Sequence, residues 1–219
     1  MNFIELIGKF VMKYVVGRRK VKVLPNKKHI ACIGDSITFG HGVRGKKELT
    51  WEYFLNEKLG SDYQVLNYGV SGRTLQREGD FPYVNDEIYH QSLNCEADIY
   101  LIMLGTNDAK TSFWNKERFY KEYEIFVDRY LNIKSHPEVI LLSPPCCFAI
   151  NGQVAFGINE SNVCEIVGIV KEIAERKSLT FIDMYHLSEN HPEWFMDGVH
   201  PNEEGNRGIA KYLAEQLNK

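Results

Sequence analysis

Three residues near the two ends of the sequence have the types that nucleophilic hydrolysis needs. Ser36 lies in the segment Gly34–Thr38, at the end of an apolar run, and His200 follows Asp197 by three positions near the C-terminus. A serine hydroxyl is a weak nucleophile until a base accepts its proton, and imidazole titrates near neutral pH. A carboxylate on the other ring nitrogen fixes the tautomer and stabilises the imidazolium. We therefore predict Ser36 as nucleophile, His200 as base and Asp197 as the residue that orients it.

Two intervening positions have the chemistry to stabilise an anion. Gly72 ends the segment Gly69–Gly72 and Asn107 lies in Gly105–Asp108, each at or just after another apolar run. Attack on an ester carbonyl places negative charge on its oxygen, and each hydrogen-bond donor aimed there typically lowers the barrier by about 2.7–4 kcal/mol. Glycine lets the backbone approach a substrate closely because it has no Cβ. The predicted donors are the backbone N–H groups of Ser36 and Gly72 and the side-chain amide of Asn107.

The elements that must position these residues alternate along the chain. Five apolar, β-rich runs predict strands: His29–Gly34, Tyr63–Asn67, Asp98–Leu104, Glu138–Ser143 and Leu179–Ile182. Segments with helical periodicity separate and follow them: Leu49–Leu59, Val84–Leu93, Lys116–Ile133, Asn159–Arg176 and Glu203–Leu217. This alternation predicts βαβ units and one three-layer α/β domain with a five-stranded parallel sheet. Ligands bind beyond the carboxyl ends of such strands, so the five candidate residues are expected to meet at one edge of the sheet.

These segments resemble the SGNH hydrolases, also called the GDSL esterase family. The family's Ser, Gly, Asn and His correspond to Ser36, Gly72, Asn107 and His200. Ile37 stands where leucine is commonest in the first motif. The resemblance runs from about residue 29 to the C-terminus. It implies a flavodoxin-like sheet, an acyl-serine mechanism without metal or cofactor, and ester substrates. The segments Gly69–Tyr83 and Met103–Trp114 look like those of bacterial acylhydrolases and sialate-type O-acetylesterases.

Composition and charge limit the kinds of partner, metal site and cellular location that are expected. The chain has 219 residues and a formal net charge of −3, which gives no reason to expect nucleic acid as a partner. Five cysteines without CxxC spacing predict neither a disulfide framework nor a zinc site, which favours a reducing, cytoplasmic location. Cys32 and Cys164 lie in apolar surroundings and are interpreted as core residues. The sequence leaves the oligomeric state open.

Residues 1–28 form a basic lead-in to the domain 29–219. Phe3, Ile7, Phe10 and Tyr14 recur at helical spacing and predict an amphipathic helix. The stretch is too short and too charged to span a bilayer. Such a helix packs on the domain's own surface or, aided by the basic residues that follow, makes a peripheral membrane or partner contact through residues 1–24. Both interpretations remain open from sequence.

Other polar residues near the motifs receive supporting roles. We expect Asp35 to hold its loop by hydrogen bonds and Asp108 to cap the following helix. Arg73 either holds an anionic or sugar substrate or is a solvated loop cation. His41, His186 and His191 are interpreted as surface or loop residues. The aromatic residues of the loops supply either pocket walls or core: Phe113, Trp114, Phe148, Phe156, Trp194 and Phe195.

The site residues and the resemblance together predict a serine esterase. The expected substrate is a small-molecule acyl ester, most simply an O-acetyl group on a carbohydrate. Acyl transfer to another acceptor and hydrolysis of lysophospholipids or thioesters are alternatives on the same site. A non-catalytic module that binds an anion at Gly34–Thr38 is the alternative outside catalysis, but it gives Asn107, Asp197 and His200 no role.

Overall fold

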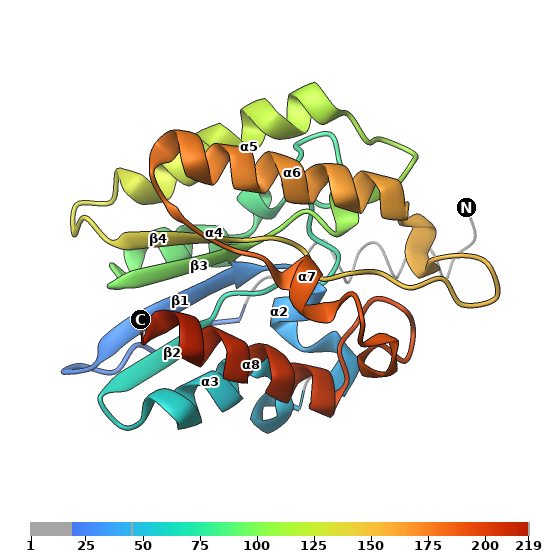
Figure 1. Ribbon diagram of the computed structural model, residues 1–219. Helices are drawn as coiled ribbons and strands as arrows, with labels where there is room; N and C mark the ends of the chain where they lie inside the picture. Colours follow the sequence, from blue (N-terminus) through green and yellow to red (C-terminus); the bar gives the residue numbers. More distant parts are fainter. Residues whose placement is uncertain (1–18, 45, 219) are drawn as a thin grey trace.

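The computed structural model describes residues 19–44 and 46–218. Its centre is an all-parallel sheet in the order β2-β1-β3-β4-β5 (Figure 1). The strands are β1 (Lys28–Gly34), β2 (Tyr63–Asn67), β3 (Ile99–Met103), β4 (Glu138–Leu142) and β5 (Thr180–Ile182). Each predicted strand is found with its ends within one residue. The predicted fold class, a flavodoxin-like three-layer α/β domain, is confirmed.

Helices cover both faces of this sheet (Figure 1). One face carries α4 (Glu87–Asn94), α5 (Lys116–Leu131) and α6 (Glu160–Lys177), and the other carries α3 (Trp51–Leu59) and α8 (Glu203–Leu217). Two short helices, α2 (Ser36–Phe39) and α7 (Met184–Ser188), follow β1 and β5. The predicted helix at Val84–Leu93 begins three residues later than expected, because residues Tyr83–Asn85 form a separate 3-10 turn.

Alternation along the strands explains the two hydrophobic cores. In β3, Tyr100 and Ile102 pack with the α4–α5–α6 layer, whereas Ile99, Leu101 and Met103 pack with the α3–α8 layer. Successive side chains of a strand point to opposite faces, so a strand covered on both sides must be apolar throughout. All five residues of β3 are buried. This rigid centre fixes the positions of the loops at its carboxyl edge.

Side-chain caps determine where several of the helices begin. Thr50, Asn115, Asn159 and Asn202 each accept a hydrogen bond from the backbone N–H three residues later, at the starts of α3, α5, α6 and α8. Such a cap typically stabilises a helix by about 1 kcal/mol. Pro201 lies just before this last helix, because Asn202 takes the N-cap position.

The N-terminal lead-in is described only from Arg19 onward. The guanidinium of Arg19 donates to the carbonyl oxygens of Asn67 (2.8 Å) and Gly69 (2.9 Å), at the end of β2. The predicted amphipathic helix lies outside the described residues, so it stays a prediction. Within residues 19–44 and 46–218, no helix is both long enough and apolar enough to cross a membrane. Cys32 is buried as expected, but Cys164 is exposed on α6, so its assignment to the core was wrong.

Candidate active site

Ser36 stands at the carboxyl end of β1, where the strand turns sharply into α2. Asp35 caps this short helix: its Oδ1 accepts the backbone N–H of Ile37 at 2.9 Å. A Cβ at Gly34 would collide with the Thr38 side chain, so the tight turn requires glycine there. The expectation that Asp35 holds its loop is confirmed by this contact. Only 6% of Ser36 is exposed.

Asp197 and His200 lie in the loop between α7 and α8 and reach the same serine. His200 Nε2 is 2.8 Å from Ser36 Oγ, and His200 Nδ1 is 2.7 Å from Asp197 Oδ2. The other carboxylate oxygen, Oδ1, accepts the backbone N–H groups of Val199 (3.0 Å) and His200 (2.7 Å). Partial burial acts to raise the pKa of Asp197, but the hydrogen bonds from His200 and Val199 outweigh it and hold that pKa below its ordinary value. The carboxylate is therefore ionised and fixes the ring.

The loops after β2 and β3 bring Gly72 and Asn107 to the same edge. The backbone N–H of Val70 donates to the carbonyl of Gly34 at 3.0 Å, which joins the Gly72 loop to β1. Gly72 has a φ of 77°, in the left-handed region that favours glycine. The Asn107 amide nitrogen donates to the carbonyl of Arg73 (3.1 Å) and, at 3.4 Å, to Asp35 Oδ2. Asn107 thus contacts the neighbours of both Gly72 and Ser36.

The five residues predicted from sequence are therefore assembled at one sheet edge. A model of the GDSL-like Lipase/Acylhydrolase family matches residues 32–207, a span that contains all five of them. The chain belongs to this family. The family resemblance inferred from the motifs is confirmed.

Two curated relatives of this family member are esterases. It is 31% identical over 208 residues to an acetylxylan esterase of Xylanibacter ruminicola, covering 86% of this chain and 42% of that protein. It is 24% identical over 234 residues to a multidomain esterase of Ruminococcus flavefaciens, covering 90% of this chain and 28% of that protein. The chain thus spans less than half the length of either relative.

Solved structures show the same fold over nearly all of their own length. An aryl esterase of M. smegmatis superimposes with a TM-score of 0.72 at 25% identity, covering 88% of this chain and 99% of that one. A carbohydrate acetylesterase from Sinorhizobium meliloti gives a TM-score of 0.72 at 22% identity, with the same coverage. The fold of these esterases therefore covers most of this chain.

Two buried carboxyls of this GDSL-family site support the loops. Burial raises the pKa of Asp35 to about 6 and that of Asp108 to about 7. Asp108 accepts the backbone N–H groups of Leu75 (2.9 Å) and Gln76 (2.7 Å). The expectation that Asp108 caps the following helix was wrong, because the loop after Gly72 passes over it and supplies both donors. The two carboxyls tie the loops after β1, β2 and β3 together.

Arg73 has neither of the roles expected for it. Only 1% of the residue is exposed, and its guanidinium forms two bonds to Asp86, at 2.5 and 2.9 Å. A third bond, of 2.9 Å, goes to the carbonyl of Ser71. Arg73 is therefore a buried clamp that closes the loop around Gly72, rather than a substrate contact or a solvated cation.

The rings of His41, interpreted from sequence as a surface or loop residue, and of Phe156, interpreted as pocket wall or core, both contact His200. The ring of His41 lies 4.5 Å from that of His200, centroid to centroid, and Phe156 meets it edge-on at 5.4 Å. Burial and the neighbouring His200 lower the pKa of His41. His41 is a loop residue, as expected, but it is also part of the site. Nothing in the spacing of Phe156, which lies 44 positions before His200, predicted this contact.

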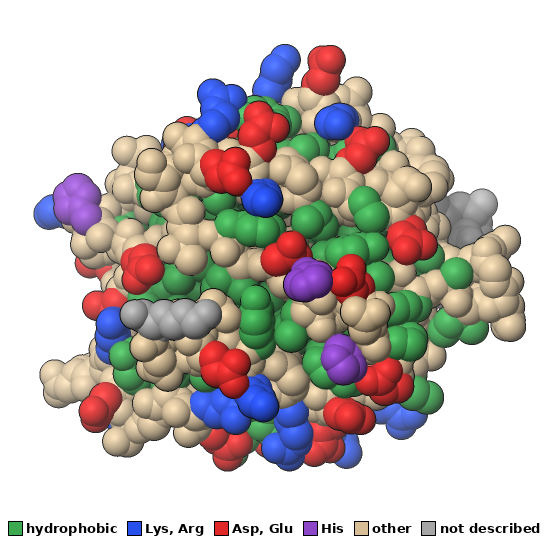
Figure 2. Space-filling view, in the orientation of Figure 1, with side chains coloured by type: hydrophobic (Ala, Val, Ile, Leu, Met, Phe, Trp, Pro, Cys, Tyr) green, Lys and Arg blue, Asp and Glu red, His purple; other side chains and the backbone are tan. Residues whose placement is uncertain are grey.

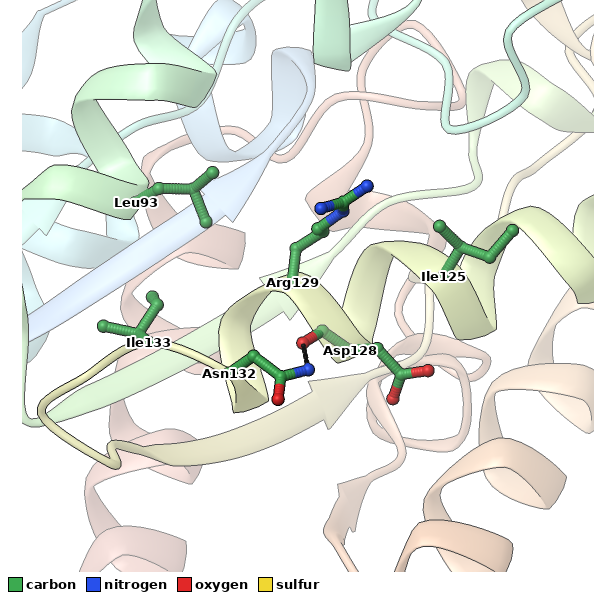
Figure 3. A pocket seen from close by; sticks show the side chains of 6 residues that line it. All are labelled: Leu93, Ile125, Asp128, Arg129, Asn132 and Ile133. Atoms are coloured by element: carbon green, nitrogen blue, oxygen red, sulfur yellow. Dashed lines mark hydrogen bonds between the residues drawn. The ribbon is translucent and has the colours of Figure 1, made fainter.

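Two cavities elsewhere in the described chain do not contain the five site residues. One, of about 530 Å³, lies between α4 and the C-terminal part of α5 (Figure 3). The other, of about 900 Å³, lies beside β2 and α3 and includes Arg19 and Glu52. No group of three or more His, Cys, Asp or Glu side chains in residues 19–44 and 46–218 is arranged to hold a metal ion.

Proposed function

We propose that this protein is a serine esterase that removes a small acyl group, an acetyl group, from a hydroxyl of a carbohydrate. The observation that carries the proposal is the continuous chain from Ser36 Oγ to His200 Nε2 (2.8 Å) and from His200 Nδ1 to Asp197 (2.7 Å). This arrangement supplies a nucleophile, a base and an ionised orienting group within hydrogen-bond distance.

The proposed reaction has two balanced steps. His200 accepts the proton of Ser36 as Oγ bonds to the ester carbon, and the resulting oxyanion is stabilised by the backbone N–H groups of Ser36 and Gly72 and the amide of Asn107. The carbon–oxygen bond to the alcohol then breaks, and His200 donates its proton to the departing oxygen. Water, deprotonated by His200, cleaves the acyl-Ser36 ester, releasing the acid and returning the proton to Oγ.

The choice of substrate rests on what the relatives act on. The curated relative with 31% identity is named an acetylxylan esterase, and the neighbouring structures include a carbohydrate acetylesterase. Both names describe an acetyl ester of a sugar, in which a small acyl group is bound to a polar alcohol. They support an acetylated carbohydrate as the substrate here.

A panel of esters tests this function directly. Wild-type protein is expected to deacetylate xylo-oligosaccharides and to hydrolyse p-nitrophenyl acetate faster than p-nitrophenyl esters of longer acids. Ser36→Ala should abolish both activities, and a fluorophosphonate probe should label wild-type protein but not this variant. Activity of Ser36→Ala near the wild-type level, or a preference for long acyl chains, would contradict the proposal. Ester products on an added sugar acceptor would indicate acyl transfer instead.

A smaller proposal concerns the cellular location of the protein and the role of its N-terminal segment. Cys32, Cys95, Cys146, Cys147 and Cys164 are all free thiols, which supports a reducing, cytoplasmic location. The basic residues near the N-terminus support a peripheral membrane contact through residues 1–24. Salt-sensitive binding to anionic vesicles that is lost on deletion of residues 1–24 is the expected result. No binding at low salt would contradict it.

A further inference from the structure

Exposed hydrophobic side chains occur on the two loops that meet at His200. In the described residues, seven large hydrophobic side chains are exposed: Val23, Leu24, Tyr53, Ile125, Ile150, Phe156 and Met196. Three of these, Ile150, Phe156 and Met196, lie on the loop after β4 and the loop after α7, which meet at His200. Figure 2 shows hydrophobic side chains at the surface over these two loops, on the right of the view. Apolar surface concentrated at a catalytic group marks a ligand contact rather than random exposure.

A backbone hydrogen bond joins these two loops. The N–H of Phe148 donates to the carbonyl of Gly198 at 2.8 Å. A Cβ at Gly198 would collide with the Phe148 carbonyl oxygen, and the Ile150 side chain lies 3.6 Å from the same point. The segment carrying Ile150 and Phe156 is thus packed on the turn between Asp197 and His200. Movement of either loop would disturb the other.

The loop after β4 also contains a tight turn of its own. Ile150 and Gln153 exchange backbone hydrogen bonds of 2.8 and 3.3 Å around Asn151 and Gly152. Both central residues have positive φ, 54° and 82°, which is the geometry of a tight type I′ turn. Phe156 follows with a φ of 62°, a strained value for a bulky side chain. Phe156 stays 56% exposed in this conformation, and its ring meets that of His200 edge-on at 5.4 Å. Strained residues occur preferentially at binding and catalytic sites, so we use this position as an indication of a ligand contact.

The direction of the proposed reaction decides which part of a substrate meets this ring. His200 must deliver its proton to the oxygen of the departing alcohol, so the alcohol lies next to Nε2. The proposed anion-stabilising donors come from the loops after β1, β2 and β3, whereas Phe156 reaches the His200 ring from the loop after β4. A side chain that contacts the ring of the proton donor is therefore placed to border the alcohol rather than the acyl group.

We infer that Phe156, flanked by Ile150 and Met196, forms a subsite for the alcohol part of the ester, and that Phe156 is the platform on which a pyranose ring carrying the acetyl group stacks. The inference rests on the proposed function and names the substrate contact of that same site. One face of a pyranose presents several C–H groups, which pack on an aromatic ring. A preformed platform binds such a ring with little ordering of the loop.

Two esters and a set of Phe156 variants test the subsite. Acetylated xylo-oligosaccharide contains the ring, whereas methyl acetate presents the same acetyl group without one. Phe156→Ala should raise KM for the oligosaccharide about tenfold, the effect of losing one ring contact. The same variant should lower kcat/KM for methyl acetate by a several-fold smaller factor, because this ester has no ring that could stack on Phe156. Phe156→Tyr keeps the ring and should behave as wild type on both esters.

Two controls distinguish the loss of the Phe156 ring from the relief of backbone strain and from the loss of any exposed apolar side chain. Phe156→Gly relieves the positive φ and removes the ring, so it should match Phe156→Ala. Ile125→Ala removes a side chain of similar exposure on α5 (Figure 3) and should change neither ester's hydrolysis. Recovery of the oligosaccharide KM in Phe156→Gly would show that only backbone strain matters and would overturn the inference.

The remaining outcomes distinguish the subsite from the proposed function. An equal fall on both esters in Phe156→Ala would show that Phe156 supports His200, and an unchanged oligosaccharide KM would show no contact. Either result overturns the subsite while Ser36-dependent hydrolysis stands. Wild-type protein that hydrolyses neither ester, or hydrolysis that survives in Ser36→Ala, would instead remove the proposed function itself.

Discussion

The loops on the two sides of Ser36 differ in burial and in charge. On one side, here called the Gly72 side, residues 68–86 and 107–108 surround a buried ion pair, Arg73 with Asp86, and two buried carboxyls, Asp35 and Asp108. On the other, here called the His200 side, residues 148–157 and 195–200 expose Ile150, Phe156 and Met196. Charge is therefore enclosed on the Gly72 side, and apolar surface is presented to solvent on the His200 side.

This contrast separates two tasks of the proposed enzyme. Donors that stabilise an anion act best when they are already oriented, because reorientation during the reaction costs free energy. The buried charges of the Gly72 side hold the loops that carry such donors. The His200 side meets the variable part of a substrate, where exposed apolar surface recognises shape. The comparison predicts that substitutions on the Gly72 side affect stability and rate, whereas substitutions of the exposed apolar residues Ile150, Phe156 and Met196 on the His200 side affect substrate preference.

The largest expected effect comes from breaking the buried ion pair. Asp86→Ala leaves the Arg73 guanidinium buried without its carboxylate and should lower the free energy of unfolding by about 3–5 kcal/mol. The matched control is Asp80→Ala, which removes the half-exposed partner of Lys110 and should cost about 0–1 kcal/mol. Urea denaturation measures both. Equal small losses would show that Arg73 is not a clamp and would weaken the contrast between the two sides.

The next largest effect concerns rate alone. Asn107→Ala removes a proposed anion donor and should lower kcat by about 10²–10³, or roughly 2.7–4 kcal/mol in the barrier. Stability should change far less, because the side chain makes only two hydrogen bonds, one of them long. Asn132→Ala, which removes an amide bonded to Asp128 at the end of α5, is the control (Figure 3). A kcat within tenfold of wild type would remove Asn107 from the machinery.

The same contrast shows what the sequence could predict. The strands follow from apolar runs, and Ser36, Gly72, Asn107, Asp197 and His200 follow from local motifs at strand ends. Both signals depend on neighbours in sequence. The sheet needs only such local patterns to bring these ends together, so the fold and the convergence of the five residues at one sheet edge could be predicted from sequence, whereas their roles in catalysis stay a prediction.

The contacts around those residues depend on how the loops pack on one another. Local sequence patterns do not predict this packing. Arg73 pairs with a carboxylate 13 positions away in a loop without periodicity. The backbone N–H groups that donate to Asp108 lie 32 and 33 positions earlier in the sequence. The role of Phe156 depends on a backbone bond between two loops that are 50 residues apart. Such contacts come from tertiary packing, which periodicity and capping rules do not describe.

The pH dependence of stability should have opposite signs on the two sides. Native Asp108 keeps its proton to about pH 7, whereas an ordinary aspartate loses it near 3.8. Between these values the native state binds more protons, so its stability falls as the pH rises. Asp35 acts in the same direction up to about pH 6. Asp108→Asn should flatten this decline, which is on the order of a few kcal/mol.

Asp197 on the His200 side should behave in the opposite way. Its pKa is lowered in the native state, so the unfolded chain takes up the proton first and stability is lost as the pH falls below about 4. Asp197→Asn should reduce this acid loss without altering the neutral region. Thermal unfolding of wild type and both variants from pH 3 to 8 separates the two effects. Identical profiles for the two variants would show that the sides do not differ in electrostatics.

The smallest expected effect tests whether an exposed side chain of the His200 side contacts the substrate without contributing to the stability of the fold. Met196 is 78% exposed, so Met196→Ser should change the free energy of unfolding by no more than about 0.5 kcal/mol. At the same time it should raise KM for acetylated xylo-oligosaccharide about twofold, since an adaptable apolar contact is lost without loss of the platform. Val23→Ser, on the lead-in, should alter neither quantity. A loss of stability with an unchanged KM would place Met196 in the packed structure that holds His200, and the two sides would then differ in charge but not in task.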